Sequence, residues 1–324
     1  MAPLDSAIRV EFSRRLPGGV FVYQGYTDND WTVLAIPNGG YILGLMIESS
    51  MQHQSSSLHP DPIHVTAHFM RSTIVGPFEV HINVLKTGKG LTNLSLQFIQ
   101  NTQVRVLAHI IHGVLEAPVD TPGPSLTISP PSPYARRIPM HTHPANCPQT
   151  APRQKWTYKN RIAVASDPVY VEKASTPQKG LEFGMYITMK DEEARITTPG
   201  LAFLADVFEA MDEHIPGIHQ SMRAVSWAPT IVMTLEFKFP IPRPSSSDHS
   251  RRTVAVFSSG KFMNDPQGRH DTYVEVWTAP SNIAEGEVKE DWKETQRCIA
   301  VSTQMALVMP GSVNLKLGTR ETKL

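Results

Sequence analysis

The chain has 324 residues, which is enough for two ordinary domains or for one duplicated unit with a shared core. Its 30 basic and 30 acidic side chains balance, so electrostatics gives no reason to expect nucleic acid or an anionic membrane as the main partner. No stretch approaches the roughly 18 uninterrupted apolar residues of a membrane span, and the N-terminus lacks the basic-then-apolar layout of a secretory signal.

The cysteines point to a reducing intracellular compartment, either the cytoplasm or the peroxisome. Cys147 and Cys298 are too few for a disulfide framework and carry no metal-binding spacing. The tail Thr322-Lys323-Leu324 resembles the Ser-Lys-Leu peroxisomal address. An ordinary frayed tail is the alternative for these three residues.

Residues 1–116 form the first of two similar units. A helix is predicted at 39–54, where Asn38-Gly39-Gly40 leads into an apolar run from Tyr41 to Ile47. Strands are predicted at 12–16, 20–26, 63–72 and 78–87, followed by a hairpin over 91–115 that turns at Asn101-Thr102. The apolar character of the helix indicates that the strands enclose it.

A proline-rich connector follows at 117–153. It holds ten prolines, a density that forbids a helix interior and a central strand alike. We expect an extended segment laid over the surface of one of its neighbours. Two further loops are expected at 240–252 and at 279–293, the second of them acidic.

Residues 154–324 repeat the first unit. A helix is predicted at 199–213, opening on Thr198-Pro199-Gly200, and nearly every residue from Leu201 to Phe208 is apolar, as in a helix enclosed by its fold. Strands are predicted at 156–163, 181–189, 230–239, 253–262, 270–278 and 297–308. Strands around a single enclosed helix, twice over, predict the α+β class and a tandem (double) hotdog, in which each antiparallel sheet wraps a central helix.

Several short motifs resemble a known family, the double-hotdog acyl-CoA thioesterases of the TesB or type II kind, together with related fungal thioesterase-like proteins. The motifs are Pro37-Asn-Gly-Gly-Tyr41, His68-Phe-Met-Arg71, Leu204-Ala-Asp206, Thr230, Glu236-Phe-Lys-Phe-Pro240 and Ser302-Thr-Gln304. The resemblance implies hydrolysis of an acyl thioester, either acyl-CoA or a carrier-bound acyl chain, without metal or organic cofactor. Hotdog units often associate through sheet edges, so a homo-oligomer is compatible with this prediction.

By the same resemblance, three side chains of the second unit form the catalytic site. They are Asp206 on the inner helix, Thr230 at the start of the next strand and Gln304 near the end of the last strand. An alignment of the strand ends without a gap would put Met305 in place of Gln304, and a shift of one residue turns a strand side chain to the other face. Thr234 is the fallback hydroxyl on the same strand as Thr230.

These residue types suit thioester hydrolysis. A carboxylate such as Asp206, buried on a helix, has a raised pKa and can take the proton of an attacking water. Backbone amides at a helix start can receive the oxyanion, and Gly39 and Gly40 allow close approach there. The plainer interpretations are a solvated helix face for Asp206, ordinary strand roles for Thr230 and Gln304, and a tight turn at the glycines.

The two units differ where the chemistry is expected. Alignment of Gly40 with Gly200 places Met46 opposite Asp206 and His112 opposite Gln304. Glu48 points about 200° away from the position of Met46 on an ideal helix and is a poor substitute. We therefore expect one active site in each chain.

Other arrangements are less favoured. His141-Thr-His143 and Cys147 lie in the connector without a second ligand pair, so no metal site is expected. The chain has no Gly-x-Ser-x-Gly motif, which disfavours a serine esterase.

Two other functions stay open. One fold hosts many chemistries, so a biosynthetic hotdog enzyme that dehydrates, isomerises or cyclises a polyketide-like substrate is one alternative. The other is a lapsed acyl-binding protein, which an exposed Asp206 remote from Gln304 would favour.

Overall fold

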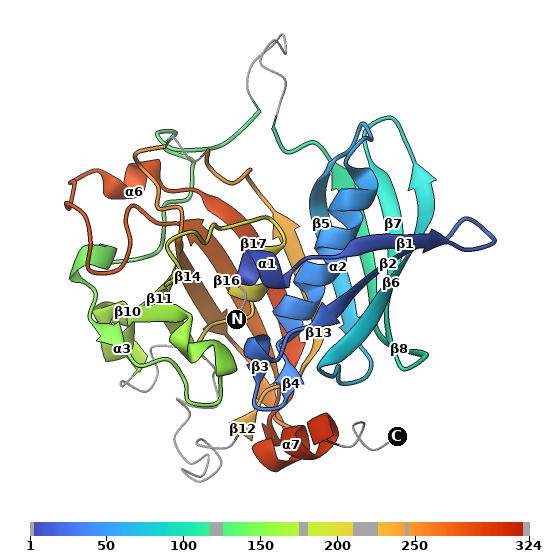
Figure 1. Cartoon of the computed structure of the whole chain (residues 1–324). Helices are drawn as coiled ribbons and strands as arrows, with labels where there is room; N and C mark the ends of the chain where they lie inside the picture. Colours follow the sequence, from blue (N-terminus) through green and yellow to red (C-terminus); the bar gives the residue numbers. More distant parts are fainter. Residues whose placement is uncertain (1–2, 117–125, 175–180, 210–225, 244–245, 320–324) are drawn as a thin grey trace.

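Figure 1 shows a computed structural model of the chain, which describes residues 3–116, 126–174, 181–209, 226–243 and 246–319. Among these residues, no helix combines the length and the apolar character that crossing a membrane requires. The tail Thr322-Lys323-Leu324 lies outside the described residues, so the peroxisomal address stays a prediction.

The first half is an antiparallel sheet that curls around helix α2 (Gly39–Gln54) (Figure 1). Its strands lie in the order β1-β2-β6-β7-β8-β5. Their bounds are Glu11–Arg15 (β1), Phe21–Thr27 (β2), Asp61–Phe69 (β5), Gly76–Thr87 (β6), Thr92–Gln100 (β7) and Gln103–Gly113 (β8). The short elements before α2 are α1 (Leu4–Ala7), η1 (Asn29–Trp31), β3 (Thr32–Val33) and β4 (Ile36–Pro37). The apolar run from Tyr41 to Ile47 is fully buried, which confirms the enclosed helix.

The second half repeats this plan with sheet order β13-β17-β16-β14-β11-β10-β9. The bounds are Gln149–Thr150 (β9), Ile162–Ser166 (β10), Leu181–Met189 (β11), Thr230–Phe237 (β13), Thr253–Gly260 (β14), Arg269–Thr278 (β16) and Cys298–Ala306 (β17), with helix α4 at Gly200–Leu204. The smaller elements are η2 (Pro144–Asn146), η3 (Thr157–Asn160), α3 (Pro168–Ala174), β12 (Ser226–Trp227), β15 (Met263–Asn264), α6 (Trp292–Thr295), β18 (Met309–Pro310) and α7 (Gly311–Thr319).

The two halves share one sheet. Strands β5 and β13 pair antiparallel, with His68 opposite Val232 and His64 opposite Glu236, so the sheet of one half continues into the other. Helices α2 and α4 meet inside this continuous sheet. The architecture is the tandem hotdog that the sequence predicts.

Glycine on α2 permits the close approach of the two central helices. A Cβ atom at Gly40 would lie 2.2 Å from the carbonyl oxygen of Ala202, and one at Gly44 would lie 2.9 Å from that of Pro199. Both distances are below ordinary van der Waals contact, so a larger residue would push the helices apart. This packing brings the N-terminal end of α2 against the residues that follow α4.

Two predicted elements differ from the structure. The helix predicted at 199–213 ends at Leu204, because the next amides, those of Asp206 and Val207, bond three residues back instead of four; residues 210–213 lie outside the described ranges. The strand predicted at 156–163 begins only at Ile162 and is preceded by η3. The turn of η3 places the rings of Trp156 and Tyr158 in the core.

The described part of the connector covers the outer face of the second sheet. Ile138, Met140 and Cys147 pack on sheet residues that include Tyr186 and Trp277, forming a second apolar cluster. Arg136 of the connector pairs with Glu275 of β16, whose side chain is 2% exposed. The connector thereby shields a buried carboxylate and the ring of a sheet tryptophan.

Candidate active site

One cavity of about 290 Å³ lies where the two halves meet. The first half contributes Asn38 and Gly39, from the start of α2, and Phe69 from the end of β5. From the second half come Asp206, Thr230 and Gln304. The cavity therefore contains all three predicted catalytic residues and one of the two predicted oxyanion glycines.

Asp206 lies in the turn directly after α4, deep in the protein, and part of its surface faces the cavity. Its Oδ2 atom accepts a 2.9 Å hydrogen bond from the backbone amide of Gly40. The side chain of Asn38 also lowers the pKa of this carboxylate. The short helix α4 and the start of α2 thus fix the carboxylate from two sides.

The Thr230 hydroxyl connects the carboxylate to Gln304. Its Oγ1 atom lies 3.4 Å from Oδ1 of Asp206 and 3.3 Å from Oε1 of Gln304, and its single proton can be donated to either acceptor. Nε2 of Gln304 donates to the carbonyl of Ala205 at 3.1 Å, which fixes the amide so that its oxygen faces Thr230. The three side chains form one polar group, in which the Thr230 proton serves one of the two acceptors at a time.

The strand register aims Gln304 into the cavity. On β17, Ser302 and Gln304 are buried, whereas Thr303 and Met305 are exposed, so the even-numbered residues face the core. Met305 is 36% exposed and lies on the opposite face. The cavity lining includes Gln304 and not the Met305 of the ungapped alignment.

A β-bulge in β13 turns the side chain of Thr230 toward the cavity. Met233 of β13 faces the core, and simple alternation would turn Thr230 away from it. The register shifts between Thr230 and Val232, and the extra residue re-aims the side chain. Thr234, the fallback hydroxyl, bonds instead to the hydroxyl of Thr303 at 2.6 Å.

The surroundings of Asp206 tune its proton affinity. Burial raises the pKa of Asp206 to about 6, and the hydrogen bonds from Gly40, Gln304, Thr230 and Asn38 oppose this rise. Burial is the larger effect because it removes water from the charged form. A carboxyl group with this pKa is ionised at neutral pH and still basic enough to accept a proton.

The two predicted oxyanion glycines are not equivalent. The amide of Gly40 donates to Asp206, so Gly40 contacts the carboxylate and not the predicted oxyanion position. Gly39 lines the cavity, and a Cβ atom there would lie 3.3 Å from Oδ2 of Asp206. Of this pair, only Gly39 lines the cavity, and its oxyanion role stays a prediction.

The positions of the first half that correspond to the catalytic residues are fully buried and lack access to solvent. Met46, Ser50 and His112 have no exposed surface. Nε2 of His112 lies 2.9 Å from the Ser50 hydroxyl, and Nδ1 lies 3.3 Å from the carbonyl of Pro60. Burial lowers the pKa of His112 to about 4, so this imidazole is a neutral core group at physiological pH.

Sequence reasoning missed the role of Asn38. Its Oδ1 atom accepts from the amide of Tyr41 and caps α2, while the same side chain contacts Asp206. An asparagine directly before a Gly-Gly helix start is a typical N-cap, so the sequence did carry a signal for the cap. It carried none for the contact with Asp206.

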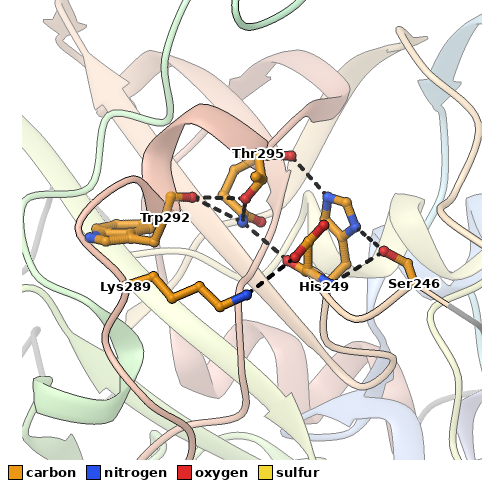
Figure 2. Close-up of polar contacts among 7 residues, drawn as sticks. Ser246, His249, Lys289, Trp292 and Thr295 are labelled. Carbon is orange, nitrogen blue, oxygen red and sulfur yellow. Dashed lines mark hydrogen bonds and ion pairs between the residues drawn. The ribbon is translucent and has the colours of Figure 1, made fainter.

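The polar clusters outside this cavity have structural roles. Nδ1 of His143 accepts from the amide of Ala145, Cys147 is buried, and no group of three or more potential metal ligands occurs in the part of the chain that the structure describes. Figure 2 shows a serine–histidine contact, in which Ser246 Oγ lies 2.7 Å from Nδ1 of His249 and Nε2 contacts the carbonyl of Thr295 at 2.9 Å. These contacts fasten the loop before β14 to the segment around α6.

Sequence comparisons relate part of the chain to known proteins. Residues 27–113, from the last residue of β2 to the end of β8, match the model of the acyl-CoA thioesterase N-terminal domain. A protein of Mycosarcoma maydis named ustilagic acid biosynthesis cluster protein orf2 is 26% identical over 99 residues, 29% of this chain. The match spans 25% of that relative's length.

Solved structures resemble the chain over nearly its whole length. A putative thioesterase II from Thermobifida fusca has a TM-score of 0.67 at 20% identity, covering 95% of this chain and 98% of that one. A hot dog protein of unknown function from Alicyclobacillus acidocaldarius has a TM-score of 0.63 at 16% identity, covering 94% and 97%. The acyl-CoA thioesterase II TesB2 from Mycobacterium marinum has a TM-score of 0.61 at 14% identity, covering 96% and 99%.

The chain thus shares the tandem hotdog fold of these structures, and much of its first half matches an acyl-CoA thioesterase domain. More particularly, the matched domain and the fold shared with TesB2 agree with the TesB-like, double-hotdog resemblance that the sequence motifs predict.

Proposed function

We propose that the chain hydrolyses an acyl thioester, carried by coenzyme A or by a carrier protein, with Asp206 as the general base. The observation that carries this proposal is the buried Asp206 carboxylate, raised in pKa to about 6 and bonded to Gly40 and Thr230 inside the cavity. A lapsed acyl-binding protein would have no reason to keep such a group. The Asp206–Thr230–Gln304 contacts also argue against that alternative.

The reaction follows from the hydrogen-bonding capacity of the three side chains. A water molecule beside Asp206 donates one proton to the carboxylate and the other to an oxygen of Thr230 or Gln304, which leaves a lone pair for the thioester carbonyl. The new C–O bond forms while Asp206 takes the proton, and the amide of Gly39 receives the oxyanion. Collapse breaks the C–S bond, and the thiolate takes the proton from Asp206. The products are a carboxylic acid and a thiol.

The cavity wall suits both parts of such a substrate. Apolar side chains, among them Ile36, Phe69 and Leu317, offer contact to an acyl chain. Arg71 and Lys155 also line the wall, and their charges favour a leaving group that carries phosphate. This combination supports a CoA-type or phosphopantetheine-type thioester.

Thiol release from acyl-CoA substrates of increasing chain length tests the proposal. The wild type should release thiol, and Asp206→Asn should reduce kcat by roughly 10² to 10⁴, the contribution of a general base. Asp191→Asn, at an exposed loop carboxylate, is the control and should behave as the wild type. Undiminished release by Asp206→Asn would remove Asp206 as the base. No release from any thioester, with tight binding of a cyclic or branched compound, would favour the non-hydrolytic biosynthetic alternative.

A further inference from the structure

The hydroxyl of Tyr158 is a buried donor that lacks a partner. Tyr158 lines the cavity, is 1% exposed, and has no hydrogen-bond partner for its hydroxyl among the residues that the structure describes. A buried polar group without a partner destabilises the folded protein. Natural proteins keep few such groups, and each one calls for an explanation.

The ring of Tyr158 is held independently of its hydroxyl. It stacks between Trp31, with centroids 5.9 Å apart, and Trp156, with centroids 5.3 Å apart. Phe203 of α4 meets it edge-on, with centroids 5.0 Å apart. The aromatic contacts fix the ring, and the hydroxyl takes no part in holding it.

The hydroxyl of Tyr158 also keeps its proton and can therefore act as a hydrogen-bond donor. Burial, and then the nearby charge of Asp206, raise the pKa of Tyr158 well above its usual value, so it stays protonated at neutral pH. The amide of Gly40 and the hydroxyl of Thr230 contact the Asp206 oxygens, whereas the Tyr158 hydroxyl has no partner among the described residues. The phenol therefore lies near the carboxylate without donating to it.

We propose that the Tyr158 hydroxyl donates a hydrogen bond to the thioester carbonyl oxygen as negative charge develops there, as the second oxyanion donor beside the amide of Gly39. This assignment rests on the proposed thioesterase function. It is needed because the amide of Gly40 already donates to Asp206. A donor aimed at the attacking water would occupy the lone pair that must reach the carbonyl carbon, whereas a donor aimed at the carbonyl oxygen stabilises the transition state.

Tyr158→Phe tests the assignment, because it keeps the ring and removes only the hydroxyl. We expect kcat to fall by roughly 10- to 1,000-fold, in the range seen when one oxyanion donor is removed, with KM changed less than about threefold. The melting temperature should stay the same or rise, since the removed group has no partner in the free protein. The pH at which activity rises should not change, because the hydroxyl does not act through Asp206.

Tyr170→Phe is the matched control. The hydroxyl of Tyr170 donates to the carbonyl of Pro139 at 2.7 Å, outside the cavity. Removing it leaves that carbonyl without this donor, so the melting temperature should fall while kcat stays at the wild-type value. The two variants therefore separate a catalytic hydroxyl from a structural one.

Three results would overturn the assignment while leaving the proposed function intact. These are wild-type kcat in Tyr158→Phe, a loss of activity that matches a loss of folded protein, and a displaced pH profile. A wild-type protein that releases no thiol from any thioester would instead contradict the proposed function itself.

Discussion

The amide of Gly40 donates a 2.9 Å hydrogen bond to Oδ2 of Asp206, although 166 residues separate them in the chain. Gly40 opens the central helix of the first half, and Asp206 follows the central helix of the second. Neither half alone holds the carboxylate in place. The duplicated fold thus yields one site that depends on both copies.

Gly40→Ala should damage both stability and activity. The added Cβ atom would meet the carbonyl oxygen of Ala202 at 2.2 Å and Cβ of Asp206 at 2.6 Å, and both neighbours would have to move. Overpacking of this kind costs about 1–3 kcal/mol. Displacement of the base should lower kcat at least tenfold. Thermal unfolding and thiol release measure the two effects.

Gly90→Ala is the control for that variant. A Cβ atom at Gly90 would have nothing within 4 Å. We expect wild-type activity and stability. If Gly40→Ala were equally harmless, the close packing of α2 against α4 would have no role in placing Asp206.

The rate should follow the ionisation of Asp206. Burial raises its pKa to about 6, and only the ionised carboxylate can accept a proton from water. The value of kcat/KM should therefore rise with pH through about 6 and then level off. Measurements of kcat/KM between about pH 4.5 and 8 test this, and a flat profile across this range would contradict a titrating base at Asp206.

The sequence predicts the start of helix α2 correctly because its two signals, a capping residue and an apolar run, lie within a few residues of each other. Asn38 caps the helix, and the buried run begins at Tyr41. The helix predicted after Pro199 is too long. The apolar run continues to Phe208, whereas the backbone changes to hydrogen bonds three residues back after α4 ends at Leu204. Nothing local in the sequence marks that change.

The sequence predicts only part of the candidate site. The family motifs gave Asp206, Thr230 and Gln304, but the bulge that turns Thr230 inward depends on pairing with β17. The bond between Gly40 and Asp206 depends on the contact of two helices distant in sequence. Contacts between residues so far apart in the chain produce no local sequence pattern from which they could be predicted.

Thr230→Val should lower kcat roughly 10- to 100-fold, because valine keeps the shape but removes the hydroxyl between Asp206 and Gln304. Thr230→Ser keeps the hydroxyl and should retain most of the activity. Thr234→Val removes a hydroxyl that bonds Thr303 on the same strand pair and should leave kcat unchanged. Equal losses in Thr230→Val and Thr234→Val would point to a general effect on β13 instead of a role in the cavity.

Asp206→Asn should make the protein more stable at neutral pH while it inactivates the enzyme. The pKa of Asp206 is about 6 in the folded protein and 3.8 as the ordinary value, so the folded state favours the protonated carboxyl. The stability that this preference contributes is complete below pH 3.8 and is lost as pH rises to about 6, a difference of roughly 2–3 kcal/mol. Asparagine is neutral throughout and can still accept from the amide of Gly40.

The comparison must use the difference between the two proteins, because His112 titrates in the opposite sense. Its pKa is about 4 when folded and 6.5 as the ordinary value, so its contribution is complete above pH 6.5 and is lost as pH falls toward 4. That contribution is common to the wild type and Asp206→Asn and cancels. Denaturant unfolding at several pH values should show the advantage of Asp206→Asn growing between about pH 4 and 6.5 and then staying constant. An advantage that does not change with pH would mean that the carboxylate is not held in a desolvated place, and the general-base role would lose its physical basis.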